Sequence, residues 1–487
     1  MICMACTLFS IPTFPADEPV SDLYTVSISG KQVPCYTARV SAIPFNRPWP
    51  GRERSLEQTE LSSFVVLNAD TTVDLTILPS RPFTQAVLRP LSCGIIPQRE
   101  GDMIRLTVPP GQYSLELDDR HCNLQIFINP SALYTRDTDT LYFGPGVHDI
   151  DHLELHSGQT LFVDAGAVVY ARTIRAYDSE NIRIIGNGIL DFSRYQRTVE
   201  DVFVEEDSGS ITFMRCRNVL VDGVILRDAT WWTMTAINCT HVHYNNVKVI
   251  GMWRYNADGL DFVNTENVTI TNSFIRSFDD SIVLKGLNKR KNGEYLARYD
   301  HMNVCHYRIE HCVVWCDWGG ALEIGAETVA DEYTDIVFRD IDIIRNADGG
   351  MRIHCGDRAE IHNVFYENIR VEYSAWDRDS VFQQNDEMQY CPPDTLHVPP
   401  VIRCWMYWGP WTPGTPNPHN IHHIHFKNIQ ISTDPGIPLP TTEFHGTDAE
   451  HGFSDITLEN ITWNGLRLHE ETLSIVKNPY VQKIHIL

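Results

Sequence analysis

The chain has 487 residues, of which 43% are hydrophobic and 21% charged, and 39 Lys and Arg residues against 63 Asp and Glu residues give a formal net charge of −24. This composition is typical of a soluble globular protein, and at this length two domains are expected. Nucleic acids and anionic membranes are bound by basic surfaces, and no apolar run reaches the roughly 18 residues of a spanning helix, so we expect neither as a partner.

Residues 1–20 are predicted to be an N-terminal tail. The first basic residue is Lys31, so the tail lacks the positively charged start of a secretory signal. Thirteen cysteines, an odd number spread along the chain, are typical of reduced thiols. We therefore expect a cytoplasmic protein, with secretion as the alternative.

Residues 21–133 are predicted to form a β-sandwich. Apolar residues alternate with polar ones in short stretches such as 73–77 and 124–128, and Pro79, Pro109 and Pro110 interrupt them. A period of two residues is typical of strands buried on one face. No cluster of chemically active residues lies here, so we expect a supporting domain, with accessory sugar binding as the alternative.

Residues 134–487 carry a different pattern, a short strand motif that recurs along the chain. Each copy opens with Asn, Asp or His before alternating apolar residues, and the copies begin at Asn181, Asn218, His241, Asn267, His306, Asp335, Asn363, His423 and Asp455. A repeat of about 23 to 30 residues with one clear strand is typical of a solenoid whose coils stack. The recurrent Asn suits a ladder of amide hydrogen bonds. We therefore predict an all-β protein, a right-handed parallel β-helix preceded by the β-sandwich.

Two acidic motifs lie about one coil apart in this solenoid. Asp258 belongs to NADGLDF (256–262), and Asp279 and Asp280 belong to FDDSIVLKG (278–286), which ends with Lys285 and a glycine. Because one coil separates equivalent positions on neighbouring rungs, we expect Asp258 and Asp279 side by side, with Asp280 next in line. Carboxylates packed this closely raise one another's proton affinity, so one can serve as an acid while another stays a base. Calcium binding is the competing interpretation of such a cluster.

At these residues the sequence resembles the polygalacturonase-like β-helix glycoside hydrolases, the clan that includes dextranases and isopullulanase. Asn256 and Asp258 match the Asn-Thr-Asp-Gly motif, with Ala257 in place of Thr, and Asp279 to Lys285 match the Asp-Asp motif. The segments 142–171 and 186–191 also resemble that clan. The resemblance implies hydrolysis with inversion, with Asp279 as general acid and Asp258 and Asp280 activating water, and it implies no cofactor or metal.

Two departures from the polygalacturonase pattern bear on the substrate. The chain has WGGALEIG (318–325) where those enzymes carry Gly-His-Gly, and it has Arg352 and His354 where they carry Arg-Ile-Lys. In pectinases that Arg and Lys are associated with the uronate carboxylate. The missing Lys, the net charge and the dextranase resemblance, which includes an N-terminal sandwich, together favour a neutral glucan. Pectic fragments remain the alternative.

A Trp- and Pro-rich insertion at 373–420 interrupts the repeats. A long loop with its own aromatic residues is commonly functional, and aromatic faces stack on sugar rings, so we expect a wall of the substrate site there. Packing against the solenoid is the alternative. The predicted substrate-binding residues are Lys285, Arg352, His354, Asn256, Trp318, Glu323, Trp405 and Trp408.

The sequence thus predicts an inverting glycosidase that acts on an α-linked oligosaccharide or polysaccharide. Two further hypotheses stay open: a β-helix polysaccharide lyase, which would need a uronate substrate and a Lys or Arg base, and a carbohydrate-binding β-helix without turnover. The pattern does not indicate an oligomeric state.

Overall fold

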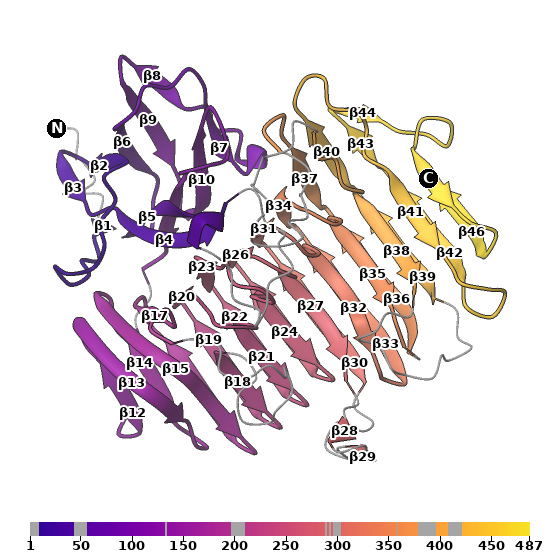
Figure 1. The fold of residues 1–487 in the computed structure, drawn as a ribbon, viewed down its shortest axis with the longest axis horizontal. Coiled ribbons are helices and arrows are strands. Elements are labelled where there is room, and N and C mark those ends of the chain that lie inside the picture. Colours follow the sequence, from indigo (N-terminus) through magenta and orange to yellow (C-terminus); the bar gives the residue numbers. More distant parts are fainter. Residues whose placement is uncertain are drawn as a thin grey trace, which may run out of the picture.

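The fold is taken from a computed structural model, which describes residues 9–42, 56–131, 134–195, 210–287, 290–291, 294–295, 303–357, 359–377, 396–407 and 421–487. These residues form β-strands almost throughout (Figure 1), with two 3-10 helices, η2 (Leu56–Gln58) and η3 (Leu91–Cys93). In the described part of the chain, no helix has the length and apolar character needed to cross a membrane.

Two sheets before residue 130 form the sandwich. One contains β1 (Phe9–Ser10), β4 (Tyr36–Ser41), β5 (Thr59–Ala69), β7 (Ala86–Arg89), β10 (Gly111–Leu117) and β11 (Leu124–Asn129). The other contains β2 (Tyr24–Ile28), β3 (Lys31–Val33), β6 (Val73–Pro79), β8 (Gln98–Glu100) and β9 (Met103–Val108). In β6 Val73, Leu75 and Ile77 are buried while Asp74 is exposed, so the alternation read from the sequence does mark the inner face.

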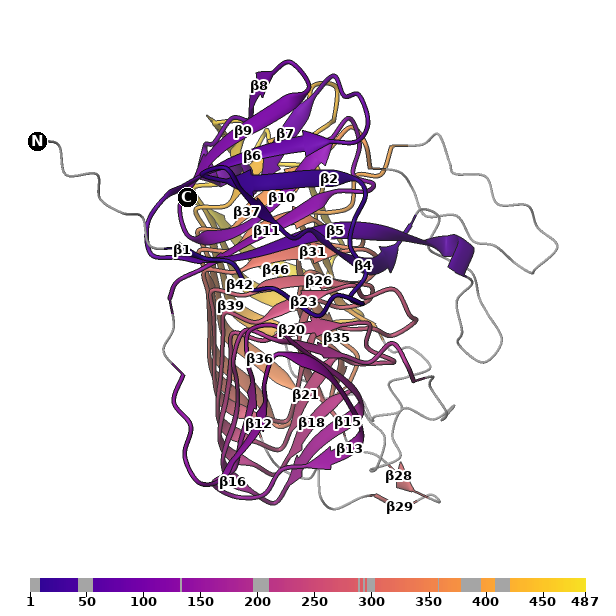
Figure 2. The ribbon, with the colours of Figure 1, turned by 90° about the vertical axis from the view of Figure 1, so that its left-hand side faces the viewer.

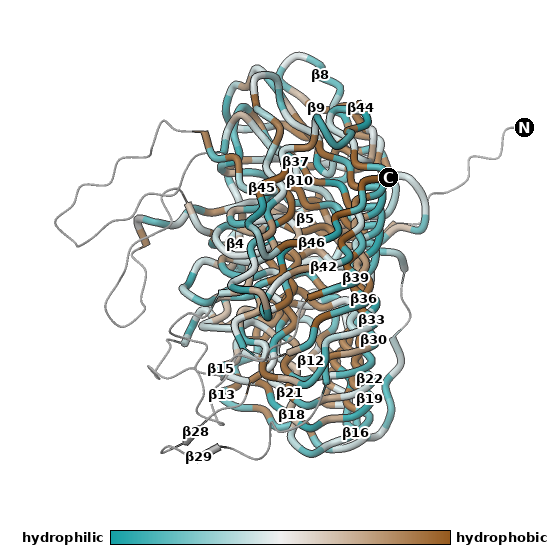
Figure 3. Tube along the Cα trace, turned by 90° about the vertical axis from the view of Figure 1, so that its right-hand side faces the viewer, coloured by the Kyte–Doolittle hydropathy of each residue, from teal (hydrophilic) through white to brown (hydrophobic). Residues whose placement is uncertain are grey.

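From residue 140 the chain winds into a right-handed parallel β-helix. One 12-stranded parallel sheet contains β12 (Thr140–Phe143), β14 (Thr160–Val163), β16 (Glu180–Ile185), β19 (Arg217–Asp222), β22 (Thr240–Asn245), β25 (Glu266–Thr271), β30 (Val304–Glu310), β33 (Glu332–Arg339), β36 (Glu360–Glu367), β39 (Ile421–Lys427), β42 (Phe453–Glu459) and β46 (Val481–Ile486). The apolar stretches form columns along the stacked coils (Figure 3). The predicted fold class is confirmed.

The other large sheet has 21 strands and begins with β13 (Gly146–Glu154) and the long β15 (Ala167–Tyr177), after which it divides into two runs. The site run contains β18 (Ile211–Met214), β21 (Met234–Ile237), β24 (Leu260–Val263), β27 (Ile282–Gly286), β32 (Leu322–Thr328), β35 (Met351–Cys355), β38 (Ile402–Met406), β41 (Thr442–His445) and β45 (Ile475–Lys477). The sandwich run contains β17 (Ile189–Asp191), β20 (Ile225–Arg227), β23 (Lys248–Ile250), β26 (Phe274–Ser277), β31 (Val313–Cys316), β34 (Asp342–Arg345), β37 (Arg370–Tyr373), β40 (Gln430–Thr433), β43 (Thr462–Trp463) and β44 (Leu466–Arg467). A separate pair joins β28 (Arg290–Lys291) and β29 (Glu294–Tyr295).

The recurring Asn, Asp and His residues have a conformational reason. All nine residues that open the predicted repeats have φ between 52° and 62°, in the left-handed region that these residue types tolerate best. A second series of such residues follows the strands of the 12-stranded sheet. Its members Asn460, Asn428, Asn368 and Asp340 are linked by side-chain hydrogen bonds of 2.7, 2.9 and 2.9 Å. The predicted amide ladder is therefore present.

The sandwich packs against the sandwich run, beside β20, β23, β26 and β31 (Figures 1 and 2). The interface has an apolar cluster that includes Phe127 and Phe274, whose rings lie 5.2 Å apart. It also has a buried ion network, in which Glu116 of the sandwich accepts from Arg89 Nε at 2.8 Å and from Arg345 Nη2 of the β-helix at 2.6 Å. The interface therefore combines apolar packing with buried charges that would be costly to separate.

Candidate active site

The predicted acids lie on turns that lead into consecutive strands of the site run. Asp258 lies two residues before β24 and Asp280 two residues before β27, and Leu260 pairs with Ile282. The Gly259 amide donates to the Asp280 carbonyl at 2.8 Å. Asp258 is therefore level with Asp280. The prediction that Asp258 and Asp279 occupy equivalent positions is wrong by one residue, because 22 residues rather than 21 separate equivalent positions in this coil.

Lys285 lies inside the carboxylate cluster. Its Nζ atom is 2.9 Å from Asp258 Oδ2, 3.3 Å from Asp261 Oδ1 and 3.8 Å from Asp280 Oδ2. The ammonium group also lies 4.1 Å from the centre of the Trp232 ring, where a cation is attracted by the ring face. The side chain was predicted to contact substrate, but here it is buried and its charge holds three acids together.

The protonation states of the two adjacent acids differ. Burial, together with the charge of Asp280, raises the pKa of Asp279 to about 7. Burial would also raise the pKa of Asp280, but Lys285 and Arg352 outweigh it and the pKa falls below its ordinary value. Near neutral pH the pair therefore combines a carboxyl that can hold a proton with an ionised carboxylate, the combination that acid and base catalysis needs.

The two buried acids beside this pair are also perturbed. Burial raises the pKa of Asp258, and the charges of Asp261 and its neighbours add to this rise while Lys285 opposes it. Burial raises the pKa of Asp261 to about 7, again against Lys285. One lysine cannot balance this many carboxylates, so the cluster holds protons at neutral pH.

Glycine is required where the next rung meets the acids. A Cβ atom on Gly319 would lie 2.4 Å from Asp280 Oδ1 and 2.6 Å from Asp279 Oδ1. The Gly320 amide donates to Asp280 Oδ1 at 2.9 Å. Beside them, the rings of Trp318 and Phe278 stack 5.7 Å apart. The Trp-Gly-Gly segment, which departs from the polygalacturonase pattern, thus shapes the surroundings of both acids.

Beyond the acids, four successive strands of the site run carry a charged residue in register, with two arginines between two glutamates. Glu323, Arg352, Arg403 and Glu443 are register partners from β32 to β41. Arg352 Nε lies 3.2 Å from Glu323 Oε1, and Arg403 Nε lies 3.4 Å from Glu443 Oε2. Both arginines also bind Asp348, Arg352 at 3.0 Å. Each guanidinium is therefore paired with two carboxylates.

His354 does not replace the missing lysine with a charge. Burial, aided by the charge of Arg352, lowers the pKa of His354 to about 4, so the ring is neutral near pH 7. Its Nε2 atom lies 3.1 Å from the Tyr407 carbonyl, and its ring lies edge-on to Trp405 at 5.0 Å. Trp405 is half-buried, and the Arg403 guanidinium lies 4.1 Å from its ring. Predicted residue Trp408 lies outside the described residues.

Most of the predicted residues thus gather along β24, β27, β32, β35 and β38. Asn256 is half-buried in the turn before β24, with a φ of 54°. Asp261, Asp348, Arg403 and Glu443 were missed. Asp261 could have been found, because it is an acid between apolar residues in the quoted motif, whereas Arg403 and Glu443 follow only from the strand register.

The described residues were also compared with the requirements of a metal site. Among them, no three His, Cys, Asp or Glu side chains are arranged to hold a metal ion. The charge that lies among Asp258, Asp261 and Asp280 is the Lys285 ammonium. All ten cysteines in the described ranges are free thiols.

The family model described as glycosyl hydrolases family 28 matches residues 174–395. A polygalacturonase from Malus domestica is 23% identical over 167 residues, 33% of this chain and 32% of that protein, so the aligned stretch spans about a third of its length.

Two solved structures are also similar. Dex49A from Penicillium minioluteum aligns with 98% of this chain and 96% of its own, with a TM-score of 0.60 and 14% identity. A hyperthermoactive exopolygalacturonase from Thermotoga maritima covers 68% of this chain and 85% of its own, with a TM-score of 0.45 and 16% identity. Residues 174–395, somewhat less than half of the chain, are therefore similar to the glycosyl hydrolases family 28, and the fold that contains them is a parallel β-helix.

Proposed function

We propose that this protein is a glycoside hydrolase that cleaves an uncharged, α-linked oligosaccharide or polysaccharide with inversion of the anomeric carbon. The observation that carries the proposal is the adjacent pair Asp279 and Asp280, whose pKa values are shifted in opposite directions. Two neighbouring carboxyl groups held in different protonation states are what glycoside hydrolysis uses. The family 28 match over residues 174–395 supports the same reaction class.

In the proposed reaction Asp279 donates its proton to the glycosidic oxygen as the bond to the anomeric carbon breaks. Asp280, the carboxylate that stays ionised, accepts a proton from the water that attacks the opposite face of that carbon, and Asp258 helps to position that water. The products are two sugar chains, with the water oxygen on the new reducing end. Lys285 would keep Asp280 ionised, because its ammonium lies 3.8 Å from Asp280 Oδ2 and, with Arg352, lowers the pKa of that carboxyl.

Charge pairing along the site run supports an uncharged substrate. Three cations of the site run, Lys285, Arg352 and Arg403, already contact carboxylates within the protein. A uronate carboxylate would have to displace these partners and approach Asp279 and Asp280. A neutral sugar meets no such cost, and the half-buried Trp405 ring offers a surface on which a sugar can stack.

A pectic fragment is the second candidate substrate. It is favoured by the similarity to a protein named polygalacturonase and by Arg352, which keeps the position of the polygalacturonase arginine. His354 in place of the lysine argues against it, because the buried imidazole is neutral. The two candidates differ in one measurable property, the charge of the sugar.

The test is a substrate panel of dextran, pullulan, soluble starch, polygalacturonate and neutral aryl α-glycosides, with reducing ends measured over time. We expect release from at least one neutral α-glucan. Asp279→Asn should lose activity by at least about 10²-fold, the scale of general acid catalysis. Asp340→Asn is the matched control, because Asp340 accepts a ladder hydrogen bond from Asn368 that an asparagine oxygen can also accept. Turnover of polygalacturonate alone would contradict the neutral substrate, and an unsaturated product that absorbs ultraviolet light would indicate a lyase.

A further inference from the structure

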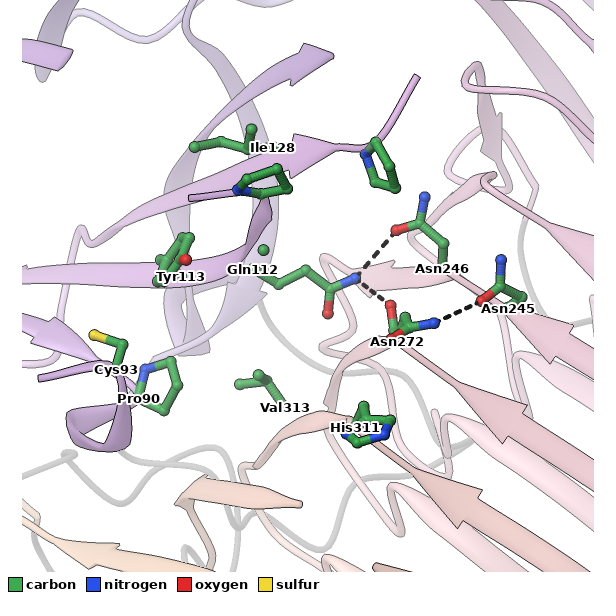
Figure 4. Close-up of a pocket in the computed structure, with 13 residues that line it drawn as sticks. Pro90, Cys93, Gln112, Tyr113, Ile128, Asn245, Asn246, Asn272, His311 and Val313 are labelled. Carbon is green, nitrogen blue, oxygen red and sulfur yellow. Dashed lines mark hydrogen bonds between the residues drawn. The ribbon is translucent and has the colours of Figure 1, made fainter. Parts of the chain in front are cut away.

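A pocket lies between the sandwich and the β-helix, and the acids do not line it. Its volume is about 390 Å³, within the range of small-molecule sites. Figure 4 shows Pro90, Cys93, Tyr113 and Ile128 on the sandwich side and His311 on the side of the β-helix. The strand β26 (Phe274–Ser277) lies between the pocket residue Asn272 and Asp279, and none of the candidate catalytic acids lines the pocket. The pocket is therefore separate from the candidate active site.

No acidic or strongly basic side chain belongs to the described lining of the pocket. The described lining residues are Pro90, Cys93, Pro110, Gly111, Gln112, Tyr113, Ile128, Pro130, Asn245, Asn246, Asn272, His311 and Val313. None of them is Asp, Glu, Lys or Arg, although the chain has 63 acids and 39 strong bases. Such a lining has nothing to balance a phosphate, a metal ion or a uronate, so it suits an uncharged ligand.

Hydrogen-bonding groups in this lining remain available to a ligand. Gln112 Nε2 donates to Asn246 Oδ1 at 3.3 Å and to the Asn272 carbonyl at 2.6 Å (Figure 4). Asn272 Nδ2 donates to Asn245 Oδ1 at 3.0 Å. Within the described ranges, the Gln112 and Asn272 side-chain oxygens and the exposed His311 ring have no hydrogen-bond partner. These groups can accept from, and the ring can also donate to, hydroxyl groups.

The pocket also has an apolar wall beside its hydrogen-bonding groups. Proline rings and the Ile128 and Val313 side chains stand beside the amides, so one wall can contact C–H groups while another binds hydroxyls. A sugar presents both kinds of surface. Asn245, Asn272 and His311 come from successive rungs, which repeat every ~4.8 Å, so a ligand can extend along the β-helix axis.

We infer that this junction pocket binds a short stretch of an uncharged saccharide chain and holds a polymeric substrate on the protein without cleaving it. The pocket and its neutral chemistry are independent of the reaction at Asp279. Only the choice of a saccharide as ligand rests on the proposed function.

The test uses the full chain and two single variants, His311→Asn and Gln112→Ala. Asparagine tolerates the φ of 56° at position 311, so the first variant removes the ring without straining the backbone. His241→Asn is the matched control, because His241 has a φ of 59° and lies outside this pocket. Thermal unfolding identifies any variant that loses its fold.

Affinity is measured by retardation in native gels that contain dextran, soluble starch or polygalacturonate. Each pocket variant should bind the neutral polymers roughly tenfold more weakly, the effect of one lost hydrogen bond with its apolar contact, while His241→Asn behaves like the wild type. For hydrolysis, KM for the polymer should rise, while kcat and the constants for a short oligosaccharide should not change.

Equal retardation of wild type and both pocket variants would overturn the inference, as would a wild type that no neutral polymer retards. The binding assay is independent of turnover, so the two proposals can fail separately. Hydrolysis with unchanged polymer KM in the variants would refute the pocket alone. Variant-sensitive retardation without hydrolysis would refute the proposed function alone.

Discussion

Replacing Gly319 by alanine tests whether the acids depend on the close approach of the next rung. Gly319 does not have a positive φ, so its backbone accepts alanine, and any effect must come from the new methyl group. That group would lie 2.4 Å from Asp280 Oδ1, 2.6 Å from Asp279 Oδ1 and 2.6 Å from the Asp280 amide nitrogen. Ordinary contacts of this kind are longer than 3 Å, so both carboxyl groups must move by about 0.5 to 1 Å.

A shift of about 1 Å in reacting groups costs roughly 10²-fold in rate, so kcat of Gly319→Ala should fall by about that factor. The assay measures initial rates on the best substrate of the panel, beside thermal unfolding. Gly144→Ala is the matched control, because Gly144 also lacks a positive φ and its methyl group would meet only the Tyr142 ring, at 3.1 Å. A Gly319→Ala enzyme that keeps its wild-type rate would refute the reasoning.

Three further outcomes follow from the charges described above. Activity should fall as pH rises through about 7, because Asp279 then loses the proton that it must donate. At the acidic end, activity should persist below the ordinary aspartate pKa of about 4, until Asp280 is protonated. A pH profile that stays flat to pH 9 would contradict this. Lys285→Met should lower the free energy of unfolding by about 3 to 5 kcal/mol at pH 7, because the buried acids lose their cation. The loss should be smaller at pH 5, where the acids can take up protons. A denaturant titration with an unchanged midpoint would contradict this prediction. Glu116→Gln should cost about 3 kcal/mol, because Arg89 and Arg345 each lose one of two carboxylate partners and keep Glu372 and Asp377 respectively. Calorimetry should show one transition for the sandwich and β-helix together, whereas two separate transitions would disprove the joined interface.

The β-helix could be predicted from the sequence because the turns of its coils require particular residue types. Each coil turns at a residue with positive φ, and only a few residue types tolerate that conformation, so Asn, Asp and His recur at Asn181, His241, Asp335 and their equivalents. The acid motifs were visible for a related reason, since Asp258 and Asp280 lie at the same point of successive coils. The exact pairing was missed by one residue because the coil length varies along the chain.

Other features depend on contacts that no local pattern records. Lys285 follows an apolar run, and its position among three carboxylates depends on the packing of β24 against β27. Arg403 meets Arg352 and Asp348 only because β38 (Ile402–Met406), which lies within the predicted insertion at 373–420, pairs with β35 in the sheet. The junction pocket combines Gln112 with Asn272, which come from different parts of the chain, so strand periodicity could not indicate it.

The most direct test of the proposed reaction is the configuration of the first product. An α-linked glucan that the wild type cleaves is followed by proton NMR from the first seconds of hydrolysis, before the anomers equilibrate. The proposed single displacement by water predicts that the β-anomer appears first, and that Asp279→Asn yields neither anomer. Initial release of the α-anomer would contradict single displacement by water and with it the roles given to the three aspartates.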